Sequence, residues 1–409
     1  MVLLKKIKSI IYVVFTLLFT FFGCAKNKKS NIPASVRKLK NLSVIPADAR
    51  PTYTIQFNPV TTFHDTTNKT VITKFDDIAV DEQGRVYVTN YGTGQKAINI
   101  FNADGRILTH LGREGRGPGE FENILKMKIQ ANKLYVYDNI MHRINVFEIY
   151  PPVFTHEIIV DPNNWNDIQT LKKSSLRQYF VKQDGKFLTG FTIASRQPKY
   201  YRYYLADSNL KVHPQLIFKR KYSYLPSGVG GMPIPHPVSI LPITPSSLMA
   251  VSDDGHIYSS ETDDFLIKEY APDGSYQRAI YYPYKRVSVN QNEIINHYKG
   301  KSAKQLNAVR NALRDTWPAL SYMFLDDQNR LWVATFTNDK NNYKWWVLDP
   351  SGKLLAKFKW PGKRINRDWS YRNIKFVKNG FLYAFQKDTV EEGANSYNIV
   401  KFRINMIKN

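Results

Sequence analysis

The chain has 409 residues, of which 43% are hydrophobic and 14% aromatic, and its formal net charge at pH 7 is +24. This apolar content supports a sizeable core and excludes an intrinsically disordered or collagen-like chain. A single cysteine excludes an intramolecular disulfide and every Cys-based zinc finger. The excess of Lys and Arg predicts attraction to polyanions, although a charged surface that only keeps the protein soluble has the same composition.

The first 23 residues have the pattern of a signal peptide. A basic start with Lys5, Lys6 and Lys8 is followed by an apolar run from Ile10 to Phe22. At 1.5 Å rise per residue this run is too short to cross a bilayer comfortably, which is typical of the apolar region of a signal peptide. The alternative is an uncleaved anchor.

The residues Phe21-Phe22-Gly23-Cys24 resemble the lipobox of bacterial lipoproteins, and Cys24 is the only cysteine of the chain. This resemblance implies that Cys24 is lipidated and becomes the new N-terminus. By the same resemblance, Ala25 after the cysteine indicates the outer membrane. Lys26, Lys28 and Lys29 differ from an acidic surface-export signal, so the periplasmic leaflet is favoured over the cell surface. Export also places cytosolic DNA and RNA out of reach.

From residue 24 to 51 the chain is polar and basic, and we expect a flexible tether. From residue 52 to 409 one pattern recurs: a short apolar strand, a turn of the Asp-x-x-Gly or Asp-Gly type, an aromatic strand, a polar loop, another strand and a second turn. The clearest copy runs from Phe75 to Gly112, with period-two alternation throughout.

Six copies of this pattern occur, and their first turns fall near Gly84, Lys133, Gly185, Gly255, Asn329 and Gly380. Each copy supplies three or four strands that cannot bury both faces alone, so neighbouring copies must stack. Radial stacking gives an all-β, six-bladed β-propeller without long exposed sheet edges. The last copy has only three strands, and we expect the spare strand Tyr53–Asn58 to complete it.

Two insertions interrupt the repeats. Residues 219–241 are a loop rich in Pro and Gly, whereas the stretch near 288–317 is predicted to be helical. Asn290 and Glu293 resemble a capping box. An apolar stripe at helical spacing should pack on its own domain, and the alternative is a lid or a partner-binding helix. The stripe consists of Leu306, Val309, Leu313 and Trp317.

The segment from Ala103 to Ile124, ADGRILTHLGREGRGPGEFENI, with IAVDEQGRVYVTN before it, resembles the NHL-type repeats of Bacteroidetes six-bladed β-propeller lipoproteins. In that family a GxGPGEF loop follows the outer strand of a blade. Asp138 and Arg143 also resemble the acidic residue and the arginine that flank a loop in NHL repeats. The resemblance implies the fold and leaves the function open.

The glycine-rich segment Gly112–Gly119 superficially resembles a phosphate-binding loop, but it connects two predicted strands. Mononucleotide motifs need a helix N-terminus to hold the anion, so a blade-to-blade crossover is the simpler interpretation. Arg113 and Arg116 in this segment are still able to present donors to a carboxylate or phosphate.

We expect ligand binding on the face that carries the longer propeller loops, because Arg, Lys, Asn and aromatic side chains occur together there. The same composition suits any soluble loop. The candidate residues are Arg113, Arg116, Glu120, Asn90, Tyr91, Asn139, His142, Arg143, Arg196 and Tyr200.

The predicted function is therefore a membrane-anchored binding or scaffold module of the envelope. Its partner would be an anionic glycan, a lipid head group or a protein, and no cofactor is expected. The alternative is a propeller hydrolase or lyase with a metal in the central channel. The carboxylates considered for such a metal, each also suited to a turn or an ion pair, are Asp76, Asp77, Glu120 and Asp263.

Overall fold

The computed structural model describes residues 32–63, 75–90, 96–193, 200–221, 243–300, 303–365, 374–389 and 395–409. Contacts divide the chain into two units, Met1–Lys38 and Leu39–Asn409. The predicted signal peptide and Cys24 lie outside the described residues. Within these ranges no helix is both long and apolar enough to cross a membrane.

The described part of the first unit contains one short helix, α2 (Ala34–Arg37). The hydrophobic clusters of the described residues all lie in the second unit, which therefore contains its own core.

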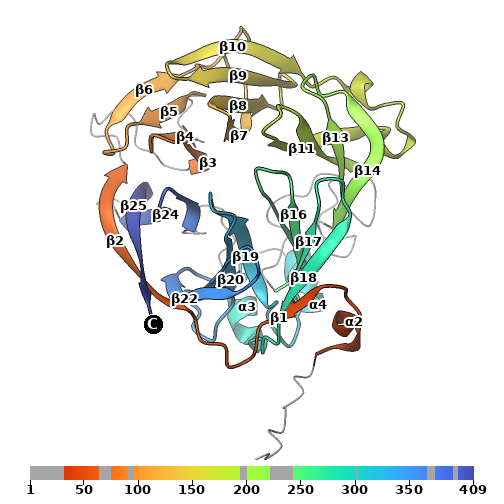
Figure 1. Cartoon of the computed structure of the whole chain (residues 1–409), viewed down its shortest axis with the longest axis vertical. Coiled ribbons are helices and arrows are strands. Elements are labelled where there is room, and N and C mark those ends of the chain that lie inside the picture. Colours follow the sequence, from red (N-terminus) through yellow and green to blue (C-terminus); the bar gives the residue numbers. More distant parts are fainter. Residues whose placement is uncertain are drawn as a thin grey trace, which may run out of the picture. The chain divides into compact units, whose positions relative to one another are not determined.

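The second unit contains six sheets arranged as blades around a common axis (Figure 1), which confirms the predicted six-bladed propeller. Blade 1 consists of β3 (Phe75–Val80), β4 (Val86–Asn90), β5 (Ile98–Phe101) and β6 (Ile107–Leu111). Blade 2 consists of β7 (Ile124–Gln130), β8 (Lys133–Asp138), β9 (Arg143–Ile149) and β10 (Pro152–Ile159). Blade 3 consists of β11 (Ser174–Val181), β12 (Phe187–Ile193), β13 (Tyr200–Ala206) and β14 (Val212–Lys221), after two 3-10 turns, η1 (Pro162–Asn164) and η2 (Gln169–Leu171).

The remaining blades include two strands from the N-terminal region. Blade 4 consists of β15 (Ser247–Val251), β16 (Ile257–Glu261), β17 (Phe265–Tyr270), β18 (Tyr276–Tyr282) and β1 (Leu42–Val44). Blade 5 consists of β19 (Leu320–Leu325), β20 (Leu331–Thr335), β21 (Asn342–Leu348) and β22 (Leu354–Pro361). Blade 6 consists of β23 (Ile374–Lys378), β24 (Phe381–Thr389), β25 (Asn395–Lys408) and β2 (Tyr53–Phe63). The innermost strand is the first of each blade, since β3 contacts β7 and β23, and β15 contacts β19.

The N-terminal strand β2 closes the ring as predicted. It pairs antiparallel with β25 from Tyr53 opposite Lys408 to Phe63 opposite Ile399, and so extends five residues beyond the predicted end at Asn58. Without β2, the edge of β25 would expose unpaired backbone groups to another chain.

The end of the segment predicted as a flexible tether is ordered instead. Strand β1 pairs in parallel with β18, from Leu42 opposite Ala279 to Val44 opposite Tyr281. Residues 45–52, which we call the N-terminal strap, then run from blade 4 to blade 6 past blade 5. The strap is fixed by a bond from Lys357 Nζ to the Ala49 carbonyl, at 2.9 Å.

The core lies between the blades, because each sheet packs on both of its faces. Every residue of β20 is buried. Leu331 and Val333 belong to a cluster shared with blade 4, whereas Trp332 and Ala334 belong to a cluster shared with blade 6. Alternate side chains of one strand therefore join two neighbouring blades.

The predicted helical insertion contains α3 (Gln291–His297) and α4 (Ala303–Asn311). Asn290 caps α3 by accepting bonds from the amides of Asn292 and Glu293. The prediction of a helix up to Trp317 is wrong beyond Asn311, where α4 ends. Trp317 is still buried in the same cluster as Val309. After α4 the chain returns in an extended conformation, and the Trp317 amide donates to the Val287 carbonyl.

Two of the Asp-x-x-Gly and related turns, in blades 1 and 5, are held by buried carboxylates. In blade 5, Asp326 Oδ2 accepts bonds from Arg330 Nε at 2.6 Å and from Trp332 Nε1 at 2.7 Å. Its other oxygen accepts the amides of Gln328 and Arg330. The carboxylate of Asp326 is fully shielded from solvent. Asp81 repeats the arrangement in blade 1.

We expect Asp326→Asn to lower the free energy of unfolding by about 2–4 kcal/mol, because an amide NH₂ would face two donors and leave a buried guanidinium unneutralised. Denaturant titration of residues 39–409 measures this loss. Asp167→Asn, at an exposed position whose side chain has no ion pair or hydrogen bond among the described residues, is the control and should change stability by less than about 0.5 kcal/mol. Equal losses in the two variants would contradict the interpretation.

Candidate functional site

The two ends of the propeller carry different kinds of connection. Because consecutive strands of a blade are antiparallel, the links between its first and second strands and between its third and fourth strands lie at one end. These links are short turns of two to five residues, and we call this end the turn face. The other links, within and between blades, lie at the opposite end, and we call it the loop face.

The two faces differ in their balance of basic and acidic residues. Among the described residues, the segments that connect strands at the loop face contain 14 Lys and Arg against 10 Asp and Glu, whereas those at the turn face contain 7 against 11. The cationic surplus of the loop face comes from two consecutive blade connections, of which the structure describes residues 283–300 and 303–319 in the first and 362–365 in the second. Together these described residues include 8 Lys and Arg against 2 Asp and Glu.

The glycine-rich loop after blade 1 folds around its own glutamate. Glu120 Oε1 accepts a bond from Arg113 Nε at 2.6 Å, and Oε2 accepts the Gly117 amide at 2.8 Å. These two contacts, with the backbone bond first, lower the pKa of Glu120. A Cβ at Gly115 would lie 2.1 Å from Glu120 Oε2, so the loop needs glycine there.

Arg143 and Asp138 hold this loop from the neighbouring blade. The Arg143 guanidinium is buried, binds Glu157 Oε2 at 2.7 Å, and donates to the carbonyls of Gly117 and Glu120. Asp138, also buried, accepts amides from residues 122, 123, 140 and 141. The pair that resembled the NHL pattern therefore acts as a fixed support for the loop.

The other predicted residues of the loop region are more exposed. Arg116 is 78% exposed and binds Glu122 at 3.1 Å. Asn139 accepts a bond from the Asn123 amide at 2.5 Å. His142 is exposed, with φ of 50°. These side chains surround the glycine-rich loop, whose positive charges are matched by three glutamates.

Tyr200 lies on a separate blade, where Lys219 Nζ lies 4.1 Å from the centre of its ring. Tyr91 and Arg196 lie outside the described residues, as does the side chain of Asn90.

Sequence reasoning missed the cations of the two basic connections, because the first connection was considered only for its apolar stripe and the second was not singled out by any motif. We call four exposed residues of these connections the basic rim, and none forms an ion pair among the described residues: Lys285, Lys299, Arg310 and Lys363. A count of charges for each connecting segment, made after the strands were assigned, would have found this surplus.

The basic rim stands on a rigid support. Arg364 joins the two basic connections through Glu293, with Nη2 to Oε2 at 2.5 Å and Nε to Oε1 at 3.1 Å. Its guanidinium also lies 5.0 Å from the Trp317 ring. Arg314 is paired with Asp263 at 2.7 Å on blade 4. The insertion is thus packed and bonded on the propeller.

A lysine from the innermost strand of blade 2 pairs with an aspartate of blade 4. Lys128 Nζ lies 3.6 Å from Asp253 Oδ1, in a turn of blade 4. Burial lowers the pKa of Lys128, Asp253 opposes this shift, and the nearby charges of Lys126 and Lys378 lower it further.

Most carboxylates considered for a metal have other partners. Asp77 accepts the amides of Ile78 and Met127, Glu120 holds the glycine-rich loop, and Asp263 pairs with arginine. The side chain of Asp76 lies outside the described residues. Within the described part of the chain, no group of three His, Cys, Asp or Glu is placed to hold a metal ion.

Comparisons with known proteins agree with the architecture. A family model described as a 6-bladed β-propeller matches residues 64–211. No curated protein matches the chain.

Alignments of this chain with three solved structures span nearly the whole length of each solved chain. An exported protein of Bacteroides fragilis is 12% identical, with a TM-score of 0.49 and coverage of 89% of this chain and 99% of that chain. Regucalcin, a calcium-binding protein of Agrobacterium tumefaciens, is 11% identical, with a TM-score of 0.38 and coverage of 89% and 97%. The PQQ-bound aldose sugar dehydrogenase of Streptomyces coelicolor is 12% identical, with a TM-score of 0.38 and coverage of 87% and 100%. Likeness at this level says nothing about ligand or activity.

We expect Lys128→Met to raise the free energy of unfolding at neutral pH, because it removes a half-buried ammonium whose charge burial and two nearby lysines disfavour, and it leaves Asp253 in solvent. The folded-state pKa of Lys128 lies below the ordinary 10.5. Between these values the unfolded chain binds a proton that the folded protein lacks, so the wild-type gains stability as pH rises through this window. The difference in free energy of unfolding between Lys128→Met and the wild type should therefore shrink as the pH approaches 10.5.

Denaturant titrations from pH 7 to 10 measure this difference, with Lys211→Met, in an exposed turn, as the control. An unchanged difference across the range, or a less stable Lys128→Met protein, would contradict the prediction.

Proposed function

We propose that this chain is a lipid-anchored binding protein of the bacterial outer membrane, in the periplasmic leaflet, and that it binds an anionic glycan through the basic rim. The observation that carries the proposal is the surplus of cations in the two joined connections of the loop face. The turn face, with its acidic excess, would repel the same ligand.

An extended polyanion suits the rim better than a small anion does. Each exposed cation contributes little alone, because water and salt screen it. Lys285, Lys299 and Arg310 come from one connection and Lys363 from the other, and the Arg364–Glu293 pair fixes the two connections together. A polymer with repeated carboxylates or sulfates is able to contact several of these cations at once, at little cost in ordering the protein.

Changing the four rim residues to Gln should weaken binding of residues 39–409 to a sulfated polysaccharide by about 30-fold in low salt, since four exposed contacts contribute about 0.5 kcal/mol each. The dependence of affinity on salt should also become shallower. Isothermal titration with heparin as the probe, in buffers of increasing salt, measures both effects.

The matched control removes the same number of charges from other exposed positions: Arg106, Lys186, Lys211 and Lys408. Equal weakening in both variants would show that only net charge matters and would overturn the proposed site. Stronger rim-dependent binding to phosphatidylglycerol vesicles than to polysaccharide would make a lipid head group the ligand.

The lipid anchor has its own test. In the full chain, Cys24→Ser should abolish incorporation of labelled fatty acid, because the thiol is the acceptor that the lipobox resemblance implies. Metabolic labelling, with sucrose-gradient separation of inner and outer membranes, measures acylation and location. Labelling that persists in Cys24→Ser would contradict the assignment, since the chain has no other cysteine.

A further inference from the structure

One tryptophan of the described residues is not buried, and it lies at the loop-face end of blade 5. Five tryptophans are at most 3% exposed: Trp165, Trp317, Trp332, Trp345 and Trp346. Trp360, next to the last residue of β22, is half-buried, and Trp369 lies outside the described residues. In the sheet Trp360 is opposite Tyr343 of β21, which is also half-buried. Directly opposite residues of an antiparallel pair share one face, so we call Tyr343 and Trp360 the aromatic pair.

The indole of Trp360 is held by rings of blade 6. Its ring centre lies 5.1 Å from that of Phe57 on β2 and 5.4 Å from that of Phe402 on β25, with interplanar angles of 80° and 87°. Edge-to-face contacts of this kind are favourable beyond the apolar area that they bury. Trp360 Nε1 is not fully buried and has no hydrogen-bond partner among the described residues, so it is free to donate to a ligand.

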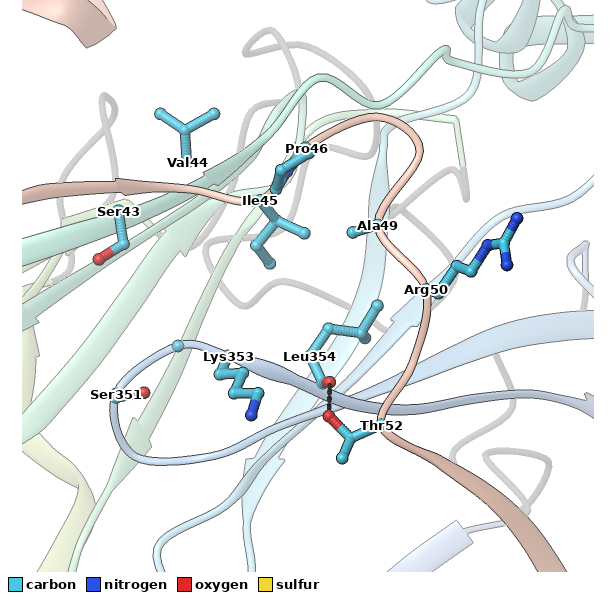
Figure 2. A pocket seen from close by; sticks show the side chains of 11 residues that line it. Ser43, Val44, Ile45, Pro46, Ala49, Arg50, Thr52, Ser351, Lys353 and Leu354 are labelled. Carbon is cyan, nitrogen blue, oxygen red and sulfur yellow. Dashed lines mark hydrogen bonds between the residues drawn. The ribbon is translucent and has the colours of Figure 1, made fainter. Parts of the chain in front are cut away.

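The strand that carries Trp360 is fixed at both ends. At the turn face, the Thr52 hydroxyl of the N-terminal strap donates to the Leu354 carbonyl at 3.2 Å, as Figure 2 shows. At the loop face, the ladder with β21 continues past the end of β22, because the Gly362 amide donates to the Asn341 carbonyl at 2.8 Å. A Cβ at Gly362 would lie 2.6 Å from the Tyr343 ring, so this close approach needs glycine. The aromatic pair is therefore preformed, and binding costs little in ordering the protein.

Polar groups suited to a sugar lie beside the aromatic pair. Lys363 of the basic rim follows Trp360 by three positions, about 10 Å along an extended chain. Asn341 is exposed, and its side-chain amide has no partner among the described residues. Asp339 in the same link is already occupied, since it accepts the backbone amide of Asn341 at 2.9 Å and the side-chain amide of Asn342 at 2.6 Å. An aromatic face, an amide and a cation together match the ring, the hydroxyl groups and the acidic group of an acidic sugar.

We propose that the aromatic pair stacks against one sugar ring of the anionic glycan, with Asn341 bonded to its hydroxyl groups and Lys363 to its acidic group. This inference rests on the proposed glycan function and makes the ring itself a recognised part of the ligand. Stacking on an aromatic face does not require a net charge on the ligand, whereas binding by exposed cations does. Inorganic polyphosphate, a polyanion without rings, should therefore bind the basic rim and not the aromatic pair.

Trp360→Leu should weaken binding of residues 39–409 to heparin about five-fold, because it removes the stacking face and keeps an apolar side chain against Phe57. It should leave unchanged both the affinity for polyphosphate and the salt dependence of heparin binding. Trp360→Phe keeps an aromatic face and should restore most of the heparin affinity. The matched control is Tyr53→Leu, at a half-buried aromatic residue of the turn-face end of β2, which should change neither affinity. Isothermal titration with each polymer measures these effects.

Tryptophan fluorescence reports on the same contact in protein that retains Trp360. In a Trp369→Phe background, the other tryptophans are buried, so collisional quenching by acrylamide acts mainly on Trp360. We expect heparin to protect Trp360 from acrylamide and polyphosphate to leave the quenching unchanged. This measurement decides the question if Trp360→Leu fails to fold, which thermal unfolding checks.

Three results would overturn the inference: folded Trp360→Leu binds heparin as tightly as the wild type, it loses affinity for heparin and polyphosphate equally, or heparin gives no protection from acrylamide. None of these results would decide the glycan proposal, which depends on the four-residue rim variant; that variant should weaken binding of both polymers. A wild-type protein that does not bind heparin would instead overturn the glycan proposal and this inference with it.

Discussion

Packing between blades is the constraint on which the rest of this structure depends. A sheet such as that of blade 5 buries residues on both faces, with Leu331 and Val333 against blade 4 and Trp332 and Ala334 against blade 6. No blade is able to satisfy both faces without two neighbours, so the ring must close, and β2 closes it on β25. Once both faces of every sheet are used, only the two ends of the propeller and the outer strands remain for binding.

The same constraint explains which elements the sequence revealed. Period-two alternation and Asp-Gly turns identify six blades because every blade repeats the same burial, and the spare strand at Tyr53 follows from a last blade with three strands. Leu42–Val44 gives no such signal, since a three-residue strand is stabilised mainly by its pairing with β18. Trp317 follows the helical spacing of Val309 but reaches the same cluster through an extended return. In both cases the conformation is set by tertiary contacts, which the local sequence pattern does not reveal.

The candidate site was harder to predict than the fold, because the sequence shows which side chains are charged and not which are neutralised. Arg113 and Arg143 have the chemistry of anion donors, yet the first binds Glu120 and the second binds Glu157 and two carbonyls. These pairings depend on the path of a glycine-rich loop. Conversely, Lys299 and Lys363 are far apart in the sequence, and their connections are brought together by tertiary contacts such as the Arg364–Glu293 pair. A basic surface of this kind becomes visible only after the connections are placed on one face.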